Sequence, residues 1–355
     1  MLQNYKYFTK FGWNSNPFTL SIYPDLLVGY SRQTDALLSH ISNFHKVGMI
    51  IGPTGSGKTT VLTWLNSYIS KNNGFRLLYI PKPPINEKGL ILLFKSLLGY
   101  NFLDKLKFRS LDINKMSEFI NEKIKNQKTI FLIDEAHECS LEVLQWLRTL
   151  NDSCPNMILI FAGLSTFEDM LTSKLPTLSM RITTKVYLKS LNETETESLI
   201  KKRIEKVGGN GIEPFTSDSI NEIYKITGGF PREIIKSCDI LIKKAAENNI
   251  SVINKAFVEK ILEKTETTGA DEIRLTLTKR QKEILSLLNE NKKLSPSDIV
   301  QYIDISEYKT KSHAIRSVNN ILRRLMIANL LKREKIGNTY LYFLSGKAKT
   351  IFTKA

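Results

Sequence analysis

Short apolar runs alternate with amphipathic segments over the first 190 residues. The runs predict strands, since they are short and bounded by polar or turn residues: Val47–Ile51, Phe75–Ile80, Thr129–Ile133, Met157–Ala162 and Lys185–Leu188. The segments between them have apolar residues at helical spacing: Ser31–Phe44, Thr60–Ser70, Leu90–Leu98, Asp112–Lys125 and Ser140–Leu150. Strands that alternate with helices predict an α/β fold with a parallel sheet covered on both faces.

The pattern becomes helical after residue 190. Helices are predicted at Glu193–Val207, Thr216–Ile226, Pro231–Glu247 and Asn254–Glu263. Residues 264–275 are polar and contain Thr-Thr-Gly, which is typical of a linker. We therefore expect a nucleotide-binding α/β core with an N-terminal arm at 1–189, a small helical domain at 190–263 and a linker at 264–275.

The last 80 residues predict a third domain, 276–355. Helices are expected at Lys279–Asn289, Ser295–Tyr302 and Lys311–Leu330. Leu331–Glu334 and Thr339–Leu344 predict a hairpin around Gly337-Asn338. Three helices followed by a hairpin describe a winged helix, which is a variant of the helix-turn-helix.

Positive charge is concentrated in this C-terminal domain. Thr276–Ala355 holds 16 Lys or Arg and 6 Asp or Glu, so it carries +10 of the formal +16 of the chain. Such a domain favours a polyanion, most often nucleic acid, over lysine enrichment that only aids solubility. Winged helices also dock proteins, but the charge favours duplex DNA. The expected phosphate and groove contacts are Lys309, Lys311, Arg316, Arg323, Arg324, Lys332, Arg333 and Lys335.

Composition excludes several other classes. No apolar run approaches the roughly 18–20 residues of a membrane-spanning helix, and Met1–Lys10 lacks the apolar core of a signal peptide. Cys139, Cys154 and Cys238 are unclustered, so neither a disulfide framework nor a zinc site is indicated. We expect a cytoplasmic protein without a membrane partner.

The chemistry centres on a glycine-rich loop between the first strand and the following helix. Its sequence, Gly52-Pro53-Thr54-Gly55-Ser56-Gly57-Lys58-Thr59, fits G-x-x-x-x-G-K-T in the required context. The glycines let successive backbone N–H groups point into one concavity, and the helix that begins around Thr60 adds its partial positive charge. We expect Lys58 to reach the outer phosphates of a nucleoside triphosphate and the Thr59 hydroxyl to hold Mg²⁺.

Two carboxylates follow the third predicted strand, where ligands bind in open α/β sheets. We expect Asp134 to hold Mg²⁺ together with Thr59, and Glu135 to act as general base on the attacking water. With Ala136 and His137 these residues spell D-E-A-H, a helicase signature. A helicase of that class needs two full nucleotide-binding domains and this chain has room for one, so His137 is expected to be structural or to support the site indirectly.

Three further features are candidates for contacts with the nucleotide or the attacking water. Arg232 lies in the first turn of a predicted helix, where a cation is unfavourable for the helix dipole, so a phosphate contact is a plausible reason for it. Ser165 or Thr166 follows the fourth strand and either orients the attacking water or caps the next helix. The aromatic-rich arm Met1–Tyr30 either packs on the nucleotide base or is a surface strap.

With these motifs in place, the chain resembles the AAA+ ATPases. It looks most like the archaeal replication initiators, which pair an AAA+ core and helical lid with a C-terminal winged helix, and like ExeA/TnsC-type ATPases. The latter have an opening similar to Phe11-Gly12 and Asn16-Pro17-Phe18, and a middle similar to Leu178–Leu191. The resemblance covers residues 11–263 and 276–355.

The resemblance implies roles for matching residues. Gly52–Thr59 match the Walker A loop, and Asp134 and Glu135 match Walker B. Arg181 matches the arginine finger that acts on the nucleotide of a neighbouring subunit, which implies a homo-oligomer. Arg232 matches the sensor arginine of the lid. The sensor residue that ends the fourth strand is Ser165, Thr166 or neither. The sequence contains no N/T-K-x-D guanine-recognition motif, which favours ATP over GTP.

The combined prediction is an ATP-hydrolysing, DNA-binding AAA+ ATPase of the replication-initiator type, in which hydrolysis switches assembly or the grip on DNA. A protein client is a further expected partner. A TnsC-type transposition ATPase and an ATP-regulated transcription factor are the alternatives. A DNA-binding protein with an inactive phosphate loop is disfavoured, because Lys58, Thr59, Asp134 and Glu135 are all present.

Overall fold

The computed structural model describes residues 7–70, 74–108, 111–262, 277–304, 306, 308, 310–327, 330–336, 339–345 and 348. The chain divides into two compact units, Met1–Lys255 and Ala256–Ala355. Each unit is considered by itself. None of the helices in the described ranges is long and apolar enough to cross a membrane.

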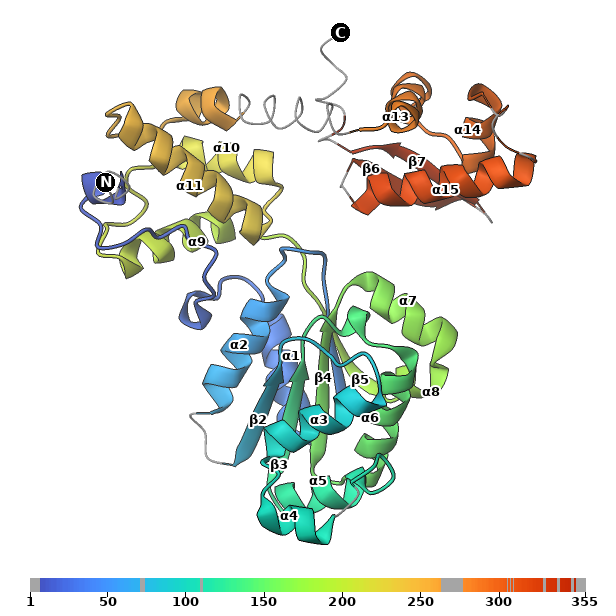
Figure 1. The fold of residues 1–355 in the computed structure, drawn as a ribbon. Coiled ribbons are helices and arrows are strands. Elements are labelled where there is room, and N and C mark those ends of the chain that lie inside the picture. Colours follow the sequence, from blue (N-terminus) through green and yellow to red (C-terminus); the bar gives the residue numbers. More distant parts are fainter. Residues whose placement is uncertain are drawn as a thin grey trace. The chain divides into compact units, whose positions relative to one another are not determined.

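A five-stranded parallel sheet forms the centre of the first unit (Figure 1). Its strands are β1 (Val47–Ile51), β2 (Phe75–Ile80), β3 (Lys128–Ile133), β4 (Met157–Gly163) and β5 (Ile182–Tyr187). The order is β2-β3-β4-β1-β5, so β1 and β3 flank β4. This order brings the loops that follow β1 and β3 to the same edge of the sheet, where open α/β sheets bind ligands. The predicted parallel α/β fold is confirmed.

Helices cover the sheet on both faces. They are α1 (Ser31–Ser42), α2 (Lys58–Ile69), α3 (Glu87–Leu98), α4 (Phe102–Lys107), α5 (Met116–Ile124), α6 (Leu141–Ser153), α7 (Ser165–Lys174) and α8 (Pro176–Ser179). Met157, Leu159 and Phe161 of β4 pack with α3, α5 and α6 in one large core. The alternate residues Ile158 and Ile160 are equally buried, as a sheet covered on both sides requires.

Side-chain caps fix where several helices begin. The Asn86 side chain accepts a hydrogen bond from the Gly89 N–H at the start of α3, and Ser140 caps α6 in the same way. A cap of this kind stabilises a helix by about 1 kcal/mol. Asn101 forms a reciprocal capping box with Asp104 at the start of α4. The short helix α4 was not predicted, because six residues are too few to show helical periodicity.

A helical subdomain follows β5 within the first unit. It consists of α9 (Glu193–Lys206), α10 (Ser217–Thr227) and α11 (Pro231–Glu247). Gly228 and Gly229, both with positive φ, form the turn between α10 and α11, and Pro231 opens α11. The Leu191 N–H donates to the Gly229 carbonyl at 2.8 Å, which ties this turn to the end of the core.

In the described residues, the second unit contains, after a helix over residues 255–262 at its start, three helices and a two-stranded antiparallel sheet. These are α13 (Lys279–Asn291), α14 (Pro296–Tyr302), α15 (Lys311–Ile327), β6 (Leu331–Ile336) and β7 (Thr339–Leu344). Buried residues from all three helices and both strands form one core. The elements follow the predicted order. The predicted linker 264–275 and the Gly337-Asn338 turn lie outside the described residues.

Some predicted boundaries were wrong. Strand β5 begins at Ile182 rather than Lys185, because it is an edge strand whose polar residues Thr183 and Thr184 interrupt the apolar pattern. Helix α2 begins at Lys58 rather than Thr60, directly after Gly57 of the glycine loop. Helix α15 ends at Ile327 rather than Leu330.

Candidate functional site

The loop between β1 and α2, residues 52–59, is shaped by its glycines. Gly55 and Gly57 have φ of +82° and +95°, a region that side chains disfavour. A Cβ atom on Gly52 would lie 2.5 Å from the Ser56 Oγ, so this position has no room for a side chain. Ser56 Oγ is buried and has no hydrogen-bond partner in the described part of the chain. The loop is therefore compact, with an unpaired polar group inside it.

Lys58 is the first residue of α2 and is 6% exposed. Its ammonium donates to the carbonyl oxygens of Gly52 at 2.9 Å and Pro53 at 3.1 Å. Burial lowers the pKa of Lys58, and the carboxylates of Glu135 and Asp134 oppose this shift. The side chain is thus held across the mouth of the loop as a poorly hydrated cation, which attracts an anion strongly.

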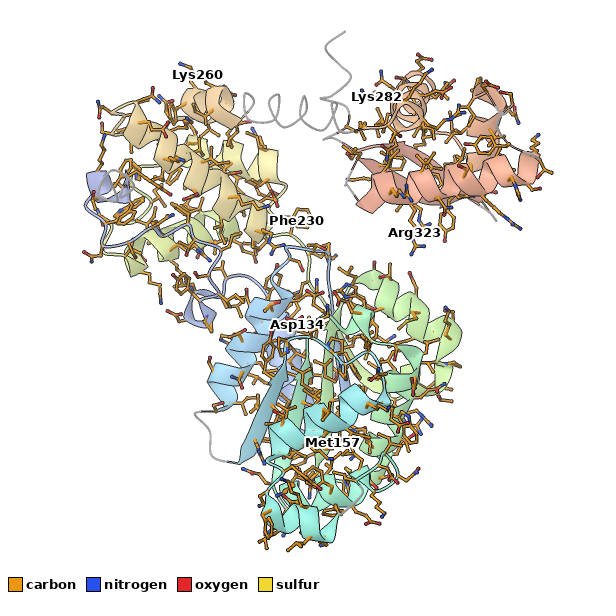
Figure 2. The ribbon with its side chains drawn as sticks, in the orientation of Figure 1. Asp134, Met157, Phe230, Lys260, Lys282 and Arg323 are labelled. Carbon is orange, nitrogen blue, oxygen red and sulfur yellow. The ribbon has the colours of Figure 1, made fainter. Side chains whose placement is uncertain are left out.

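Asp134 follows β3 and is buried beside the start of α2. The Thr59 hydroxyl donates to Asp134 Oδ2 at 2.7 Å, and the Tyr79 hydroxyl donates to the same oxygen at 3.1 Å. Burial and the Asp134 carboxylate both raise the pKa of the Tyr79 phenol. Figure 2 labels Asp134 at one end of the sheet and Met157 at the other. The sequence prediction that Thr59 and Asp134 lie together is geometrically correct.

Glu135 is partly exposed and has a left-handed backbone, with φ of +49°. Its N–H donates to Asp134 Oδ1 at 2.9 Å. Its Oε2 lies 3.4 Å from Nδ1 of His137, which belongs to the short helix η4 (Ala136–Glu138). The carboxylate therefore stays near the cation Lys58 while it faces His137.

The N-terminal arm reaches the glycine loop through Tyr30. The Tyr30 hydroxyl lies 2.7 Å from the carbonyl oxygens of both Ser56 and Lys189, so it can donate to either. A small cavity of about 50 Å³ adjoins this contact. It is lined by Tyr23, Leu26, Leu27, Val28, Tyr30, Gly57, Thr60, Leu191, Leu199, Arg203, Pro231 and Ile235. This lining is largely apolar and includes the arm, as a site for a nucleotide base would be.

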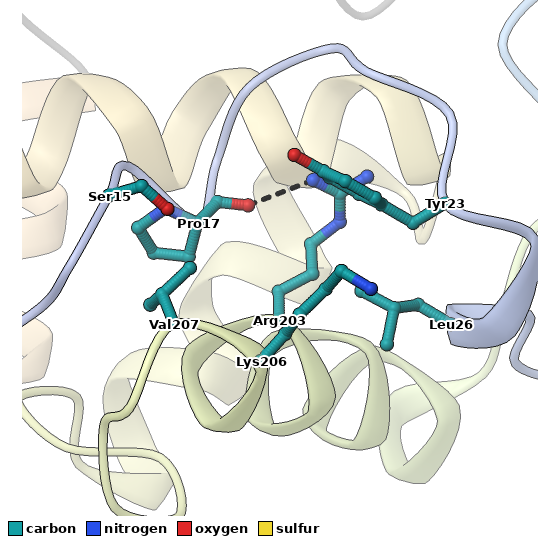
Figure 3. Close-up of a pocket in the computed structure, with 7 residues that line it drawn as sticks. All are labelled: Ser15, Pro17, Tyr23, Leu26, Arg203, Lys206 and Val207. Atoms are coloured by element: carbon teal, nitrogen blue, oxygen red, sulfur yellow. Dashed lines mark hydrogen bonds between the residues drawn. The ribbon is translucent and has the colours of Figure 1, made fainter.

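Arg203 of α9 anchors the arm to the helical subdomain. It is 6% exposed and donates to the carbonyl oxygens of Pro17 at 2.8 Å and Thr19 at 2.9 Å. Figure 3 shows its guanidinium beside the ring of Tyr23, at 5.4 Å from the ring centre. The arm is therefore both a strap on α9 and a wall of the cavity, so the two predicted roles are compatible.

Arg232 lies beside the glycine loop, in the first turn of α11. Its N–H is 3.4 Å from the Gly55 carbonyl oxygen, and a Cβ on Gly55 would lie 3.2 Å from its own Cβ. Its side chain is exposed, and its charge helps to lower the pKa of Lys58 after the larger effect of burial. The structure thus brings Arg232 to the region where a phosphate is expected.

Arg181 is held by groups of its own subunit. Its Nε and Nη2 donate to the two carboxylate oxygens of Asp152 at 2.8 Å each, and Nη1 donates to the Thr177 carbonyl at 2.7 Å. Its side chain is 38% exposed. Neither Ser165 nor Thr166 forms a side-chain cap on α7, whose N-cap is Leu164, so the capping alternative was wrong.

The candidate DNA contacts that the structure describes are exposed residues of α15 and β6. Ala314, Val318 and Leu322 face the core, whereas the exposed basic residues are Lys311, Arg316, Arg323, Arg324, Lys332 and Arg333. Arg316 and Arg323 are seven residues apart, so they share one face of the helix. Lys309 and the side chain of Lys335 lie outside the described residues.

Four residues that shape the site were not predicted: Tyr30, Tyr79, Asp152 and Arg203. Tyr79 could have been found, because β2 and β3 pair in parallel and Tyr79 lies opposite Leu132, near the end that carries Asp134. The other three residues form hydrogen bonds with residues far away in the sequence. A local sequence pattern does not predict such contacts.

Residues 44–171 match the family model described as the AAA domain. This part of the chain resembles an AAA domain. The glycine loop and the Asp134–Glu135 pair both lie within it. An uncharacterised HTH-type transcriptional regulator of Methanocaldococcus jannaschii is 25% identical over 275 residues, or 75% of this chain. The alignment spans 65% of that relative, so the chain covers less than two thirds of its length.

Solved structures share the fold beyond the AAA domain. The Aeropyrum pernix ORC2 protein, solved as ADPNP-ADP complexes, matches 95% of this chain and 96% of its own, with TM-score 0.64 and 16% identity. The Aeropyrum pernix ORC1 protein, solved in complex with DNA, matches 94% of both chains, with TM-score 0.58 and 14% identity. At these identities the likeness establishes the fold, and the predicted resemblance to archaeal replication initiators is confirmed at that level.

Proposed function

We propose that the protein is an ATPase that binds duplex DNA and whose nucleotide state sets its grip on DNA, as in a replication initiator. The observation that carries this is the convergence of Lys58, Thr59, Asp134 and Glu135 at one edge of the sheet, from segments about 75 residues apart. The structural relatives solved with ADPNP-ADP and with DNA support it.

The reaction is phosphoryl transfer from ATP to water, which depends on positioning and charge stabilisation. The N–H groups of residues 54–59 and the Lys58 ammonium bind the phosphates, after Lys58 exchanges its two carbonyl partners for phosphate oxygens. Glu135 accepts a proton from the attacking water. Arg232 approaches the phosphates from the helical subdomain 190–263, which acts as a lid.

The donor set at Thr59 and Asp134 suits Mg²⁺. A hydroxyl and a carboxylate 2.7 Å apart are the hard oxygen ligands that Mg²⁺ takes beside phosphate oxygens and water. Bound Mg²⁺ would neutralise charge on the outer phosphates. The Tyr79 hydroxyl fixes the orientation of Asp134 through the oxygen that both hydroxyls share.

We infer that residues 276–355 form a winged helix with α15 as the groove helix. Its exposed face carries Arg316 and Arg323, and no acidic residue of the described ranges forms an ion pair with either. Unpaired arginines on one helix face suit the phosphates of duplex DNA. The hairpin β6–β7 adds the exposed basic residues Lys332 and Arg333 to the same unit.

Replacing Arg316 and Arg323 together with alanine is expected to weaken duplex binding and flatten its salt dependence. Each lost phosphate contact lowers the log–log salt slope by roughly 0.9, so the double variant should lose about 1.8. Fluorescence anisotropy at several salt concentrations measures this. Lys279→Ala with Lys282→Ala on α13 is the matched control and should keep the slope. Equal slopes for the arginine variant and wild type would exclude these residues as phosphate contacts.

Arg181 is proposed to act in trans at a subunit boundary of a homo-oligomer, which requires it to exchange Asp152 for a neighbour's phosphate. Arg181→Ala should then keep nucleotide affinity and lower hydrolysis by up to about 10³-fold. Mixing Arg181→Ala subunits with Glu135→Gln subunits should restore some activity. At one type of mixed interface, the subunit that keeps Glu135 faces a neighbour that keeps Arg181. Arg148→Ala is the control, since Arg148 also approaches Asp152, at 4.0 Å. Absence of rescue at every mixing ratio would contradict action in trans.

A second candidate, an ATP-regulated transcription factor, is favoured by the similarity to the uncharacterised HTH-type transcriptional regulator of Methanocaldococcus jannaschii. Mobility-shift assays with ATP, ADP and no nucleotide test the shared core of both proposals, which is nucleotide-dependent duplex binding. Footprinting on the gene's own flanking DNA separates them: a regulator protects a promoter, whereas an initiator protects an origin-like repeat array. A protein that binds no duplex in any nucleotide state would contradict both.

A further inference from the structure

The D-E-A-H sequence contains a histidine that the proposed reaction does not yet use. His137 lies in η4, which packs against β4 and α7. Its Nδ1 is 3.4 Å from Glu135 Oε2, and the side chains of His137 and Glu135 are 22% and 44% exposed. The histidine is therefore the more fixed member of the pair, and the carboxylate is the one that can move.

The His137 Nδ1 atom is buried and makes no hydrogen bond to any described residue. A buried polar atom without a partner is costly, so a nearby acceptor is drawn to it. Glu138, the neighbouring carboxylate on η4, is engaged by Lys82 at 2.8 Å. Glu135 is the acceptor within reach, and a small rotation of its exposed side chain shortens 3.4 Å to a hydrogen bond.

The conformation of Glu135 that faces His137 also keeps the carboxylate close enough to Lys58 for its charge to act on it. The left-handed backbone of Glu135, with φ of +49°, sets the direction of its side chain and is unfavourable for a residue other than glycine. In this conformation the Glu135 charge acts on Lys58, opposing the effect of burial on the Lys58 pKa. Contact with His137 and approach to the outer phosphates are therefore compatible.

We propose that His137 is a positioning residue for ATP hydrolysis: its Nδ1–H donates to the Glu135 carboxylate and holds this base toward the attacking water. This inference rests on the proposed ATPase function. It requires a proton on Nδ1. One hydrogen bond to one carboxylate oxygen leaves the other oxygen to accept the proton from water.

Three substitutions of His137 in the full chain test whether a hydrogen-bond donor at the position of Nδ1 is required. His137→Asn places an amide N–H near the position of Nδ1, His137→Gln places it near Nε2, and His137→Leu has no donor. We expect the Leu and Gln variants to lose about tenfold in kcat, a part of the 10²–10⁴ that a positioned base contributes. KM should stay within about twofold and the Asn variant near the wild-type rate. Thermal melting verifies that each variant is folded.

Combination with Glu135→Gln decides whether His137 acts through the base. If it does, His137→Leu lowers the residual single-turnover rate of Glu135→Gln no further. A wild-type rate for the Leu and Gln variants, or an Asn variant as slow as they are, overturns the inference. A wild-type chain without ATPase activity, or a Glu135→Gln variant at the wild-type rate, instead overturns the proposed function.

Discussion

Replacing Lys58 with alanine is expected to abolish ATP binding. The side chain is buried at the mouth of the glycine loop and is the cation placed to meet the outer phosphates. Alanine removes that charge where water cannot replace it well. Ligand binding at 100 times Kd stabilises a protein by about 2.7 kcal/mol. Wild type should therefore melt several degrees higher with saturating Mg-ATP, and Lys58→Ala should not.

Lys88→Ala is the matched control for this experiment. Lys88 is an exposed lysine in the first turn of α3, so its loss changes the net charge by the same amount. It should retain the full ATP-induced shift. An undiminished shift in Lys58→Ala would mean that ATP binds elsewhere or without this contact.

Glu135→Gln is expected to bind ATP and hydrolyse it about 10²–10⁴-fold more slowly. An amide keeps the size of the side chain and its place beside His137, but it cannot accept a proton from water. Phosphate release under saturating ATP measures the rate, and the melting shift with ATP measures binding. Both measurements are needed, because the prediction is that the hydrolysis rate falls while the affinity for ATP is retained.

Glu142→Gln provides the control, since Glu142 is an exposed glutamate in the first turn of α6 and makes none of the site contacts described above. Its hydrolysis rate should equal that of wild type. A Glu135→Gln protein that turns over at the wild-type rate would show that another group is the base.

Sequence predicted the parts of the site whose signals are local. The G-x-x-x-x-G-K-T loop requires glycines at Gly55 and Gly57, and both have the positive φ expected of them. The strand before Asp134 is a continuous apolar run because it is buried on both faces. Local chemistry of this kind is enough to place Thr59 and Asp134 in contact.

Sequence did not predict contacts set by tertiary packing. The pairing of Arg181 with Asp152 joins residues 29 positions apart, and Tyr30 meets Lys189 across 159 positions. Edge strand β5 was placed three residues late, since an edge strand with one solvated side does not form an apolar run. Such features follow from how elements pack, which spacing alone does not encode.

The most direct test of the account is the affinity of the Glu135→Gln chain for duplex DNA, measured by anisotropy with ATP and again with ADP. This variant holds ATP without converting it, so each titration reports one nucleotide state. Coupling between two sites is typically worth 1–3 kcal/mol, so the account predicts dissociation constants that differ by about fivefold or more. The same dissociation constant in both states would contradict a nucleotide-controlled grip on DNA.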